Sequence, residues 1–123
     1  MIIKGNFQQL VTMCDFKTLH LDKNLGYVLQ CIDCGNITIG FKIITFSRTL
    51  PEFYRMVKDV HDCHAYHSNL GADPQTRSIP FWQLSECSCM TMSLNELHEL
   101  GVLLDLAHAR IMLEKLFLNL PDN

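Results

Sequence analysis

The sequence contains no apolar run long enough to cross a bilayer, because Asp105 interrupts the most apolar stretch, residues 102–107. Its first six residues lack the basic region and long apolar segment of a secretory signal. Lysine and arginine are scattered along the chain, and the formal net charge is only -3, so no strong positive field would attract nucleic acid. We therefore expect a cytoplasmic protein that binds neither a membrane nor a nucleic acid.

The common short signatures of enzymes are also missing. The chain has no glycine-rich phosphate loop, no Gly-x-Ser-x-Gly nucleophile turn and no His-Glu-x-x-His helix. These absences favour a non-enzymatic protein, and we assign no catalytic residue.

The composition is that of an ordinary globular protein. Hydrophobic residues make up 48% of the chain and charged residues 19%, and 123 residues is a common length for one folded unit. We expect a single domain over residues 1–123.

The first half of the chain has the pattern of β-strands. Residues 17–21 and 26–32, joined by a polar turn near Lys23 and Asn24, predict a β-hairpin. Residues 37–46 alternate apolar and polar side chains and predict one central strand, which completes a three-stranded meander. Further short strands are expected near residues 79–84 and 88–92.

Two helix starts follow strand-like segments. Thr49 with Glu52, and Ser93 with Glu96, have the hydroxyl-to-glutamate spacing of a capping box. Residues 67–78 are rich in turn-forming residues and predict an exposed loop between the helices. The predicted fold class is α+β, an antiparallel sheet of four or five strands with two helices packed on one face.

The last helix, predicted over residues 94–119, carries two apolar stripes. The first stripe comprises Leu97, Leu100, Leu104, Ala107, Ile111 and Leu118, and the second comprises Val102, Leu106, Ala109, Leu113 and Phe117. Either the helix lies between the sheet and the first helix, or the second stripe meets its copy in another subunit. We favour the second arrangement, a homodimer, because a small domain has few elements with which to bury a helix on two sides.

The most distinctive motif is Cys31-x-x-Cys34-Gly35, which has the spacing of a metal knuckle. In the predicted hairpin, residue 31 faces residue 16, so Cys14 lies across from the knuckle. Cys89 is the expected fourth ligand, with Cys87 as its alternative, and His20 is a weaker candidate. Zinc is the simplest ion for an all-thiolate structural site.

Several cysteines and histidines can be accounted for without a metal ion. Buried cysteines often act as small hydrophobes, and Cys63 is a candidate for that role. A thiol-redox enzyme using Cys31 and Cys34 fits poorly, because the motif lies between strands and does not open a helix. The histidines at positions 61, 64 and 67 fit exposure near a helix C-terminus better than metal binding.

A set of short motifs in the chain resembles a family of small uncharacterised bacterial proteins. The motifs are the early cysteine, Gly26-Tyr27, the Cys31-x-x-Cys34-Gly35 knuckle, the strand 37–46, Glu52-Phe53 and Ser93-Leu94-x-Glu96-Leu97. The resemblance implies a compact α+β domain of bacterial, cytosolic type, and it implies no activity. The early cysteine occurs there together with the Cys-x-x-Cys motif, which favours metal binding by Cys14, Cys31 and Cys34.

Two functional hypotheses follow. The first is a homodimeric protein–protein interaction module whose hairpin is stabilised by zinc. The second is a metal-free ligand-binding or scaffold protein, with its working surface at a dimer groove or around Phe81 and Trp82. We expect that aromatic pair to belong to the core more often than to a groove.

Overall fold

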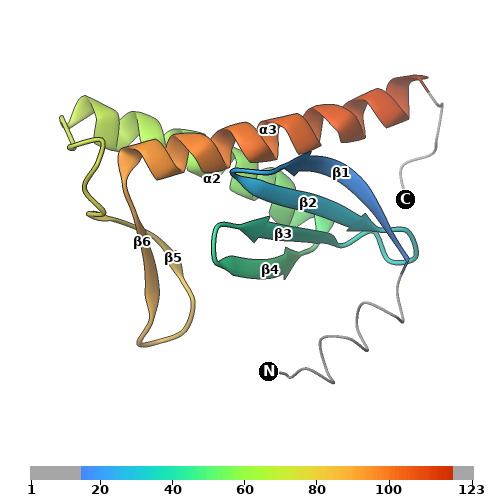
Figure 1. The fold of residues 1–123 in the computed structure, drawn as a ribbon, viewed down its shortest axis with the longest axis horizontal. Helices are drawn as coiled ribbons and strands as arrows, with labels where there is room; N and C mark the ends of the chain where they lie inside the picture. Colours follow the sequence, from blue (N-terminus) through green and yellow to red (C-terminus); the bar gives the residue numbers. More distant parts are fainter. Residues whose placement is uncertain (1–14, 118–123) are drawn as a thin grey trace.

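The computed structural model describes residues 15–117, arranged as an antiparallel sheet, a separate hairpin and two helices (Figure 1). The sheet has the strand order β1-β2-β3-β4, with bounds Phe16–Asp22, Gly26–Cys31, Ile37–Phe41 and Ile44–Arg48. Helix α2 spans Leu50–Asn69 and helix α3 spans Leu94–Phe117; between them β5 (Ile79–Gln83) pairs with β6 (Cys89–Met92). The predicted α+β class is confirmed, with four strands in the main sheet.

The first hairpin has the predicted register at its open end. Phe16 pairs with Cys31, as expected. A bulge between Thr18 and His20 then shifts the pairing by one residue, so that His20 lies opposite Val28. The extra residue, Leu19, is buried in the core, which explains why the strand departs from a regular alternation.

The prediction of one strand over residues 37–46 is wrong, because the chain reverses at Lys42 and Ile43. Phe41 pairs with Ile44, and the two residues between them form the turn that separates β3 from β4. Lys42 has a φ of 56°, a left-handed conformation that usually selects glycine or asparagine. Since neither turn residue is of that kind, the alternating pattern concealed the reversal.

A close approach of strands β2 and β3 depends on two glycines. Gly26 has a φ of 145°, and a Cβ there would lie 1.9 Å from the carbonyl oxygen of Gly40. The ring of Tyr27 lies over Gly40, where a Cβ would be 2.3 Å from the ring. Gly26 thus leaves room for the Gly40 carbonyl, and Gly40 leaves room for the ring of Tyr27, whose hydroxyl lies 3.1 Å from the Thr45 hydroxyl.

The capping boxes form as predicted. The Thr49 hydroxyl accepts a hydrogen bond from the Glu52 amide at 3.3 Å, and the Glu52 carboxylate accepts one from the Thr49 amide at 2.9 Å. Ser93 and Glu96 repeat the arrangement, with distances of 3.1 and 3.0 Å. Helix α2 continues to Asn69, so residues 67–69, expected in a loop, form its last turn.

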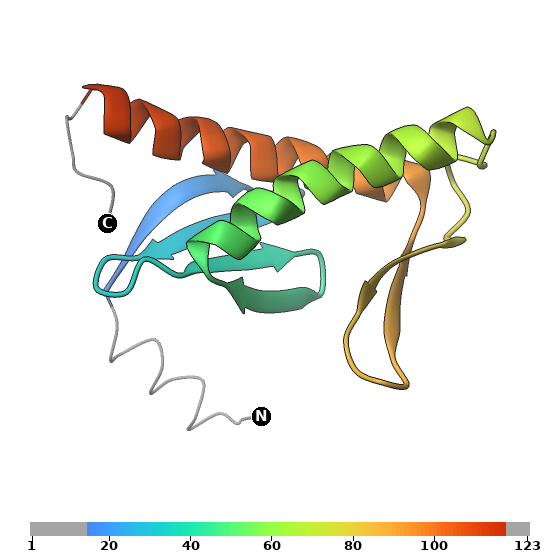
Figure 2. The same cartoon turned by 180° about the vertical axis from the view of Figure 1, so that it is seen from behind.

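One core joins the sheet to both helices. Helix α3 crosses β1 and β2, and α2 lies beside α3 on the same side of the sheet (Figures 1 and 2). The first predicted stripe of α3 faces this core: its described members are Leu97, Leu100, Leu104, Ala107 and Ile111, all buried. Leu118 lies outside the described residues. No helix within residues 15–117 is long and apolar enough to span a membrane.

Candidate functional site

The Cys31–Gly35 segment forms a tight turn between β2 and β3. The Gly35 amide donates to the Cys31 carbonyl at 2.9 Å, and the Cys31 amide donates to the Asn36 carbonyl at 2.9 Å. The Cys34 amide also donates to the Cys31 sulfur, with an N to Sγ distance of 3.4 Å. Gly35 has a φ of 81°, a left-handed conformation that glycine adopts without strain. The turn therefore wraps the backbone around one thiol, while the Cys34 side chain is exposed.

The predicted ligands of this turn are only partly placed together. The Ile32 amide donates to the Asp15 carbonyl at 2.8 Å, which brings the chain preceding β1 to the turn, but Cys14 lies outside the described residues. Cys87 and Cys89 are exposed on the β5–β6 hairpin. Cys89 shares a hollow with Phe41 and Ile44, at the end of β3 opposite to the knuckle. Within residues 15–117, no group of three or more His, Cys, Asp or Glu side chains could hold a metal ion.

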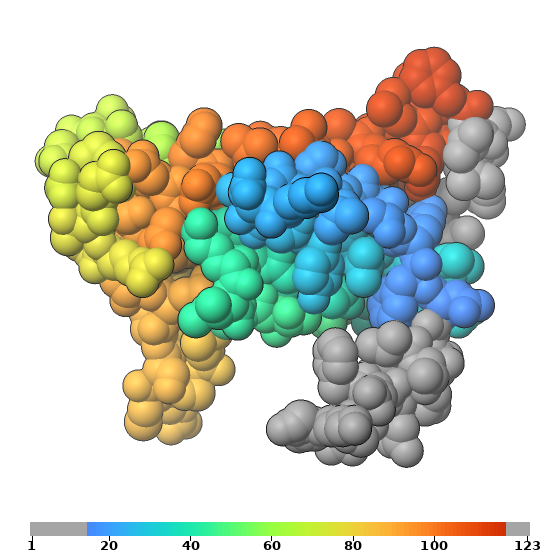
Figure 3. All heavy atoms as spheres, viewed as in Figure 1, coloured from blue at the N-terminus to red at the C-terminus, as the bar shows by residue number. Residues whose placement is uncertain are grey.

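The second stripe of α3 is not buried within the chain. Leu106 is 44% exposed, Leu113 48% and Phe117 72%. Ala109 is also exposed, and Val102 is half-buried. The space-filling view shows the last turns of α3 at the surface, next to β1, where Lys17 pairs with Glu114 at 2.7 Å (Figure 3). All five residues predicted for a dimer interface thus lie on a helix that already packs against the sheet and α2 through its other faces.

Two residues that the sequence prediction omitted extend this exposed surface. Leu116 is 72% exposed and Met112 39%. Leu116 follows Leu113 by three positions, so the spacing of the stripe could have identified it.

Charged residues at the edges of the second stripe are held within the chain. Asp105 lies 2.8 Å from the His61 ring nitrogen on α2. Arg110 pairs with Glu114 at 3.0 Å, on the same helix. These contacts leave an uncharged strip along α3.

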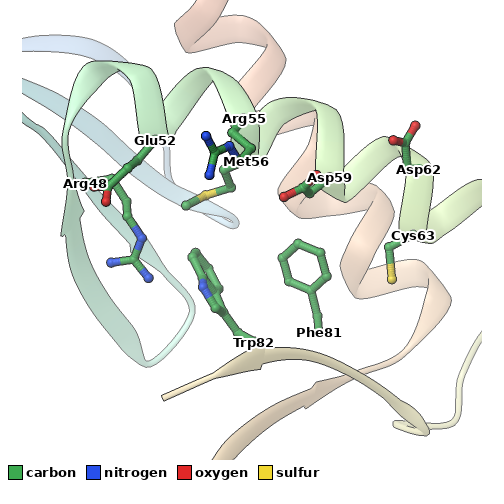
Figure 4. Close-up of a pocket in the computed structure, with 9 residues that line it drawn as sticks. All are labelled: Arg48, Glu52, Arg55, Met56, Asp59, Asp62, Cys63, Phe81 and Trp82. Carbon is green, nitrogen blue, oxygen red and sulfur yellow. The ribbon is translucent and has the colours of Figure 1, made fainter. Parts of the chain in front are cut away.

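A groove lies between α2, the end of β4 and β5, with a volume of about 510 Å³ (Figure 4). We call it the α2–β5 groove; it is lined by Arg48, Glu52, Arg55, Met56, Asp59, Asp62, Cys63, Phe81 and Trp82. The two aromatic side chains rise from β5 toward α2 (Figure 4). Phe81 and Trp82 are half-buried, so they serve both the groove and the edge of the core.

At one end of this groove, two aromatic rings and a guanidinium group pack against one another. The Phe46 and Trp82 rings meet edge to face, with centroids 4.2 Å apart. The Arg48 guanidinium lies 4.8 Å from the Trp82 centroid and 5.2 Å from that of Phe46. At the other end, partial burial raises the pKa of the Cys63 thiol, which disfavours its nucleophilic thiolate form.

The histidines have separate surroundings. His61 contacts Asp105, His64 lies 5.9 Å from the ring of His98, and the rings of His67 and Tyr66 meet edge to face. His61 and His64 thus contribute to the contact between α2 and α3.

Comparison of the chain with protein-family models, with curated proteins and with solved structures finds no match.

Proposed function

We propose that the protein is a non-enzymatic interaction module that forms a homodimer through the second stripe of α3. The exposure of this stripe is the observation that carries the proposal. Leucine and phenylalanine side chains exposed in a continuous strip mark an interaction surface. Each large side chain that is fully buried in the dimer would contribute about 1.5–3 kcal/mol.

The spacing of the stripe favours a second copy of the same helix as the partner. When Leu116 takes the last place in the stripe instead of Phe117, separations of four, three, four and three residues connect Val102, Leu106, Ala109, Leu113 and Leu116. This is the repeat of 3.5 residues with which two helices pack along a common seam. Asp105 and Arg110 flank the strip and contact His61 and Glu114, and the strip itself contains no charged residue, which favours an apolar partner.

Replacement of Leu113 with Glu tests this interface. Two-fold symmetry would place the new carboxylates of both subunits in one apolar contact, so we expect dimerisation to weaken at least about 100-fold. Light scattering after size-exclusion chromatography measures the mass. Leu21→Glu is the matched control, because Leu21 is 68% exposed on β1, and it should leave the mass unchanged. A monomeric unmodified chain would contradict the proposal.

A second proposal concerns the Cys31–Gly35 turn, which we suggest supplies two thiolates to a structural zinc ion. The support is the hydrogen bond from the Cys34 amide to the Cys31 sulfur, since such donors stabilise a negatively charged sulfur. The ion would stabilise the fold, and the ligands that complete its coordination are to be identified by mutation, starting from Cys14.

Metal content of the untagged full chain tests this site. We expect about one zinc per chain, and loss of both zinc and stability in Cys34→Ser. Cys63→Ser is the control, because Cys63 lies on α2 in the α2–β5 groove. A chain that folds without zinc, and whose stability does not change when zinc is added, would contradict this proposal while leaving the dimer proposal intact.

A further inference from the structure

The α2–β5 groove separates opposite charges along its length. Arg48 and Arg55 lie at one end together with Glu52, and Asp62 lies near the other, beside Cys63 (Figure 4). Asp59 lies between these ends, above Phe81 (Figure 4). The middle of the groove is thereby apolar below and bounded by charges of opposite sign on either side.

The two arginines at one end of the groove could bind an anionic group of a ligand. Of the four arginines in the described part of the chain, Arg77 pairs with Glu96 and Arg110 with Glu114. Arg48 and Arg55 make no ion pair there, and both line the groove. The neighbouring Glu52 carboxylate is bound to the Thr49 amide. This hydrogen bond lowers the Glu52 pKa, and the charges of Arg48 and Arg55 also help to lower it, but Glu52 forms an ion pair with neither of them. A carboxylate entering the groove would therefore meet two guanidinium groups that share one acidic neighbour.

Aromatic contacts hold the Arg48 fork in place before a ligand arrives. Its guanidinium lies within contact range of the rings of both Phe46 and Trp82. Its Nη1 atom donates to the Ser47 carbonyl at 2.7 Å. A guanidinium packed on aromatic faces keeps its remaining in-plane N–H donors available, and these suit the oxygens of a carboxylate. The rings beside it provide an apolar floor.

The dimensions suit an extended chain. Along α2, the groove runs from Glu52 to Cys63, which is about 16 Å at 1.5 Å per helical residue. An extended peptide covers that length with about five residues at 3.3 Å each.

We propose that the α2–β5 groove binds an extended peptide segment of a partner protein. Its acidic side chain would lie at Arg48 and Arg55, its central apolar side chains on Phe81 and Trp82, and its basic side chain at Asp59 and Asp62. This site is separate from the dimer stripe, which lies on α3, so either proposal can fail without the other.

Fluorescence of Trp82 tests the groove directly, because it is the sole tryptophan of the chain. The probe is the peptide acetyl-Glu-Leu-Phe-Leu-Lys-amide, titrated into the full chain. Three control peptides replace the glutamate with glutamine, the lysine with glutamine, or the three central residues with glycine. We expect a saturable change in emission with the probe, and at least about tenfold weaker binding of each control peptide.

Protein variants locate the acidic end of the peptide. Arg48→Gln and Arg55→Gln should each weaken binding of the probe about tenfold, and should reduce its preference over the glutamine-for-glutamate peptide. Lys23→Gln is the matched control: Lys23 is exposed in the β1–β2 turn, and its loss should alter affinity less than about twofold. Circular dichroism checks that each variant is folded, and Arg55, being exposed, provides the test if Arg48→Gln unfolds.

Three results would overturn the proposal. The first is the absence of a saturable change in Trp82 emission. The second is equal binding of all four peptides. The third is full competition by inorganic phosphate at the same affinity as the probe, which would make the groove a site for small anions.

Discussion

Glu96 connects three parts of the molecule through one carboxylate. It accepts hydrogen bonds from the Arg77 Nε and Nη2 atoms at 3.0 and 2.7 Å, and from the Ser93 amide at 3.0 Å. The Arg77 guanidinium is the main cause that lowers the pKa of Glu96 to about 2, and the Ser93 cap adds to it. The side chain is only 14% exposed, so the charge is held at the junction of the interhelix loop and α3.

Replacement of Glu96 with Gln should remove the ionic part of this contact and preserve its shape. Because the folded-state pKa lies below the ordinary 4.5, the carboxylate stabilises the fold above pH 4.5, and this contribution declines as the pH falls toward 2. We expect a loss of about 1–2 kcal/mol at pH 7, since Arg77 is well exposed to solvent. Urea unfolding at pH 7 and at intervals down to pH 2 measures the difference between the two proteins.

The difference should shrink across the acid range. Glu86→Gln, on the exposed turn between β5 and β6, is the control and should have little effect at any pH. A Glu96→Gln difference that stays constant from pH 7 to pH 2 would contradict this account of the charge.

At the scale of elements, the helix starts were the features most readily predicted from the sequence, because a side chain there bonds directly to the backbone. Thr49 and Ser93 mark the starts of their helices because their hydroxyls satisfy amide groups that the helix itself leaves unpaired. The reversal at Lys42 was not predictable because a lysine rarely adopts its left-handed φ, and the bulge beside Leu19 was not predictable because no turn-forming residue marks the shift in register. Tertiary packing of the sheet on the helices stabilises those conformations.

The two candidate sites, the Cys31–Gly35 turn and the α2–β5 groove, also differ in how far the sequence predicts them. The Cys31–Gly35 turn was identifiable because its residues are contiguous and include the glycine that its geometry requires. The α2–β5 groove combines a strand end, a helix and a hairpin that are distant in sequence. Phe81 and Trp82 gave a partial signal, but only the fold places Arg48 on the tryptophan ring.

The left-handed conformation of Lys42 in the β3–β4 turn predicts how two substitutions there will change stability. Lys42 has a left-handed φ and also pairs with Glu99 at 3.0 Å, so glycine and alanine substitutions both lose the ion pair. Their comparison isolates the backbone strain, and Lys42→Gly should be more stable than Lys42→Ala by about 1 kcal/mol. Thermal and urea unfolding of the pair measure this difference. Equal stabilities would mean that the turn relaxes without strain.

At the scale of the whole molecule, the surfaces with proposed roles are separate. The α2–β5 groove lies on the β5 side of α2, and the exposed stripe lies on α3. The Cys31–Gly35 turn is at the end of the sheet away from the β5–β6 hairpin (Figure 1). The proposed dimer would therefore present two grooves to partner peptides, with each knuckle free to stabilise its own sheet.

The most direct test of the central proposal is an isotope-filtered NMR measurement on an equal mixture of ¹³C-methyl-labelled and unlabelled chains. The account predicts intermolecular contacts from the methyl groups of Leu106, Leu113 and Leu116, and none from Leu21 on β1. Intermolecular contacts confined to other surfaces would contradict the proposed interface. So would the absence of any intermolecular contact in spectra in which the methyl signals of Leu106, Leu113 and Leu116 are resolved.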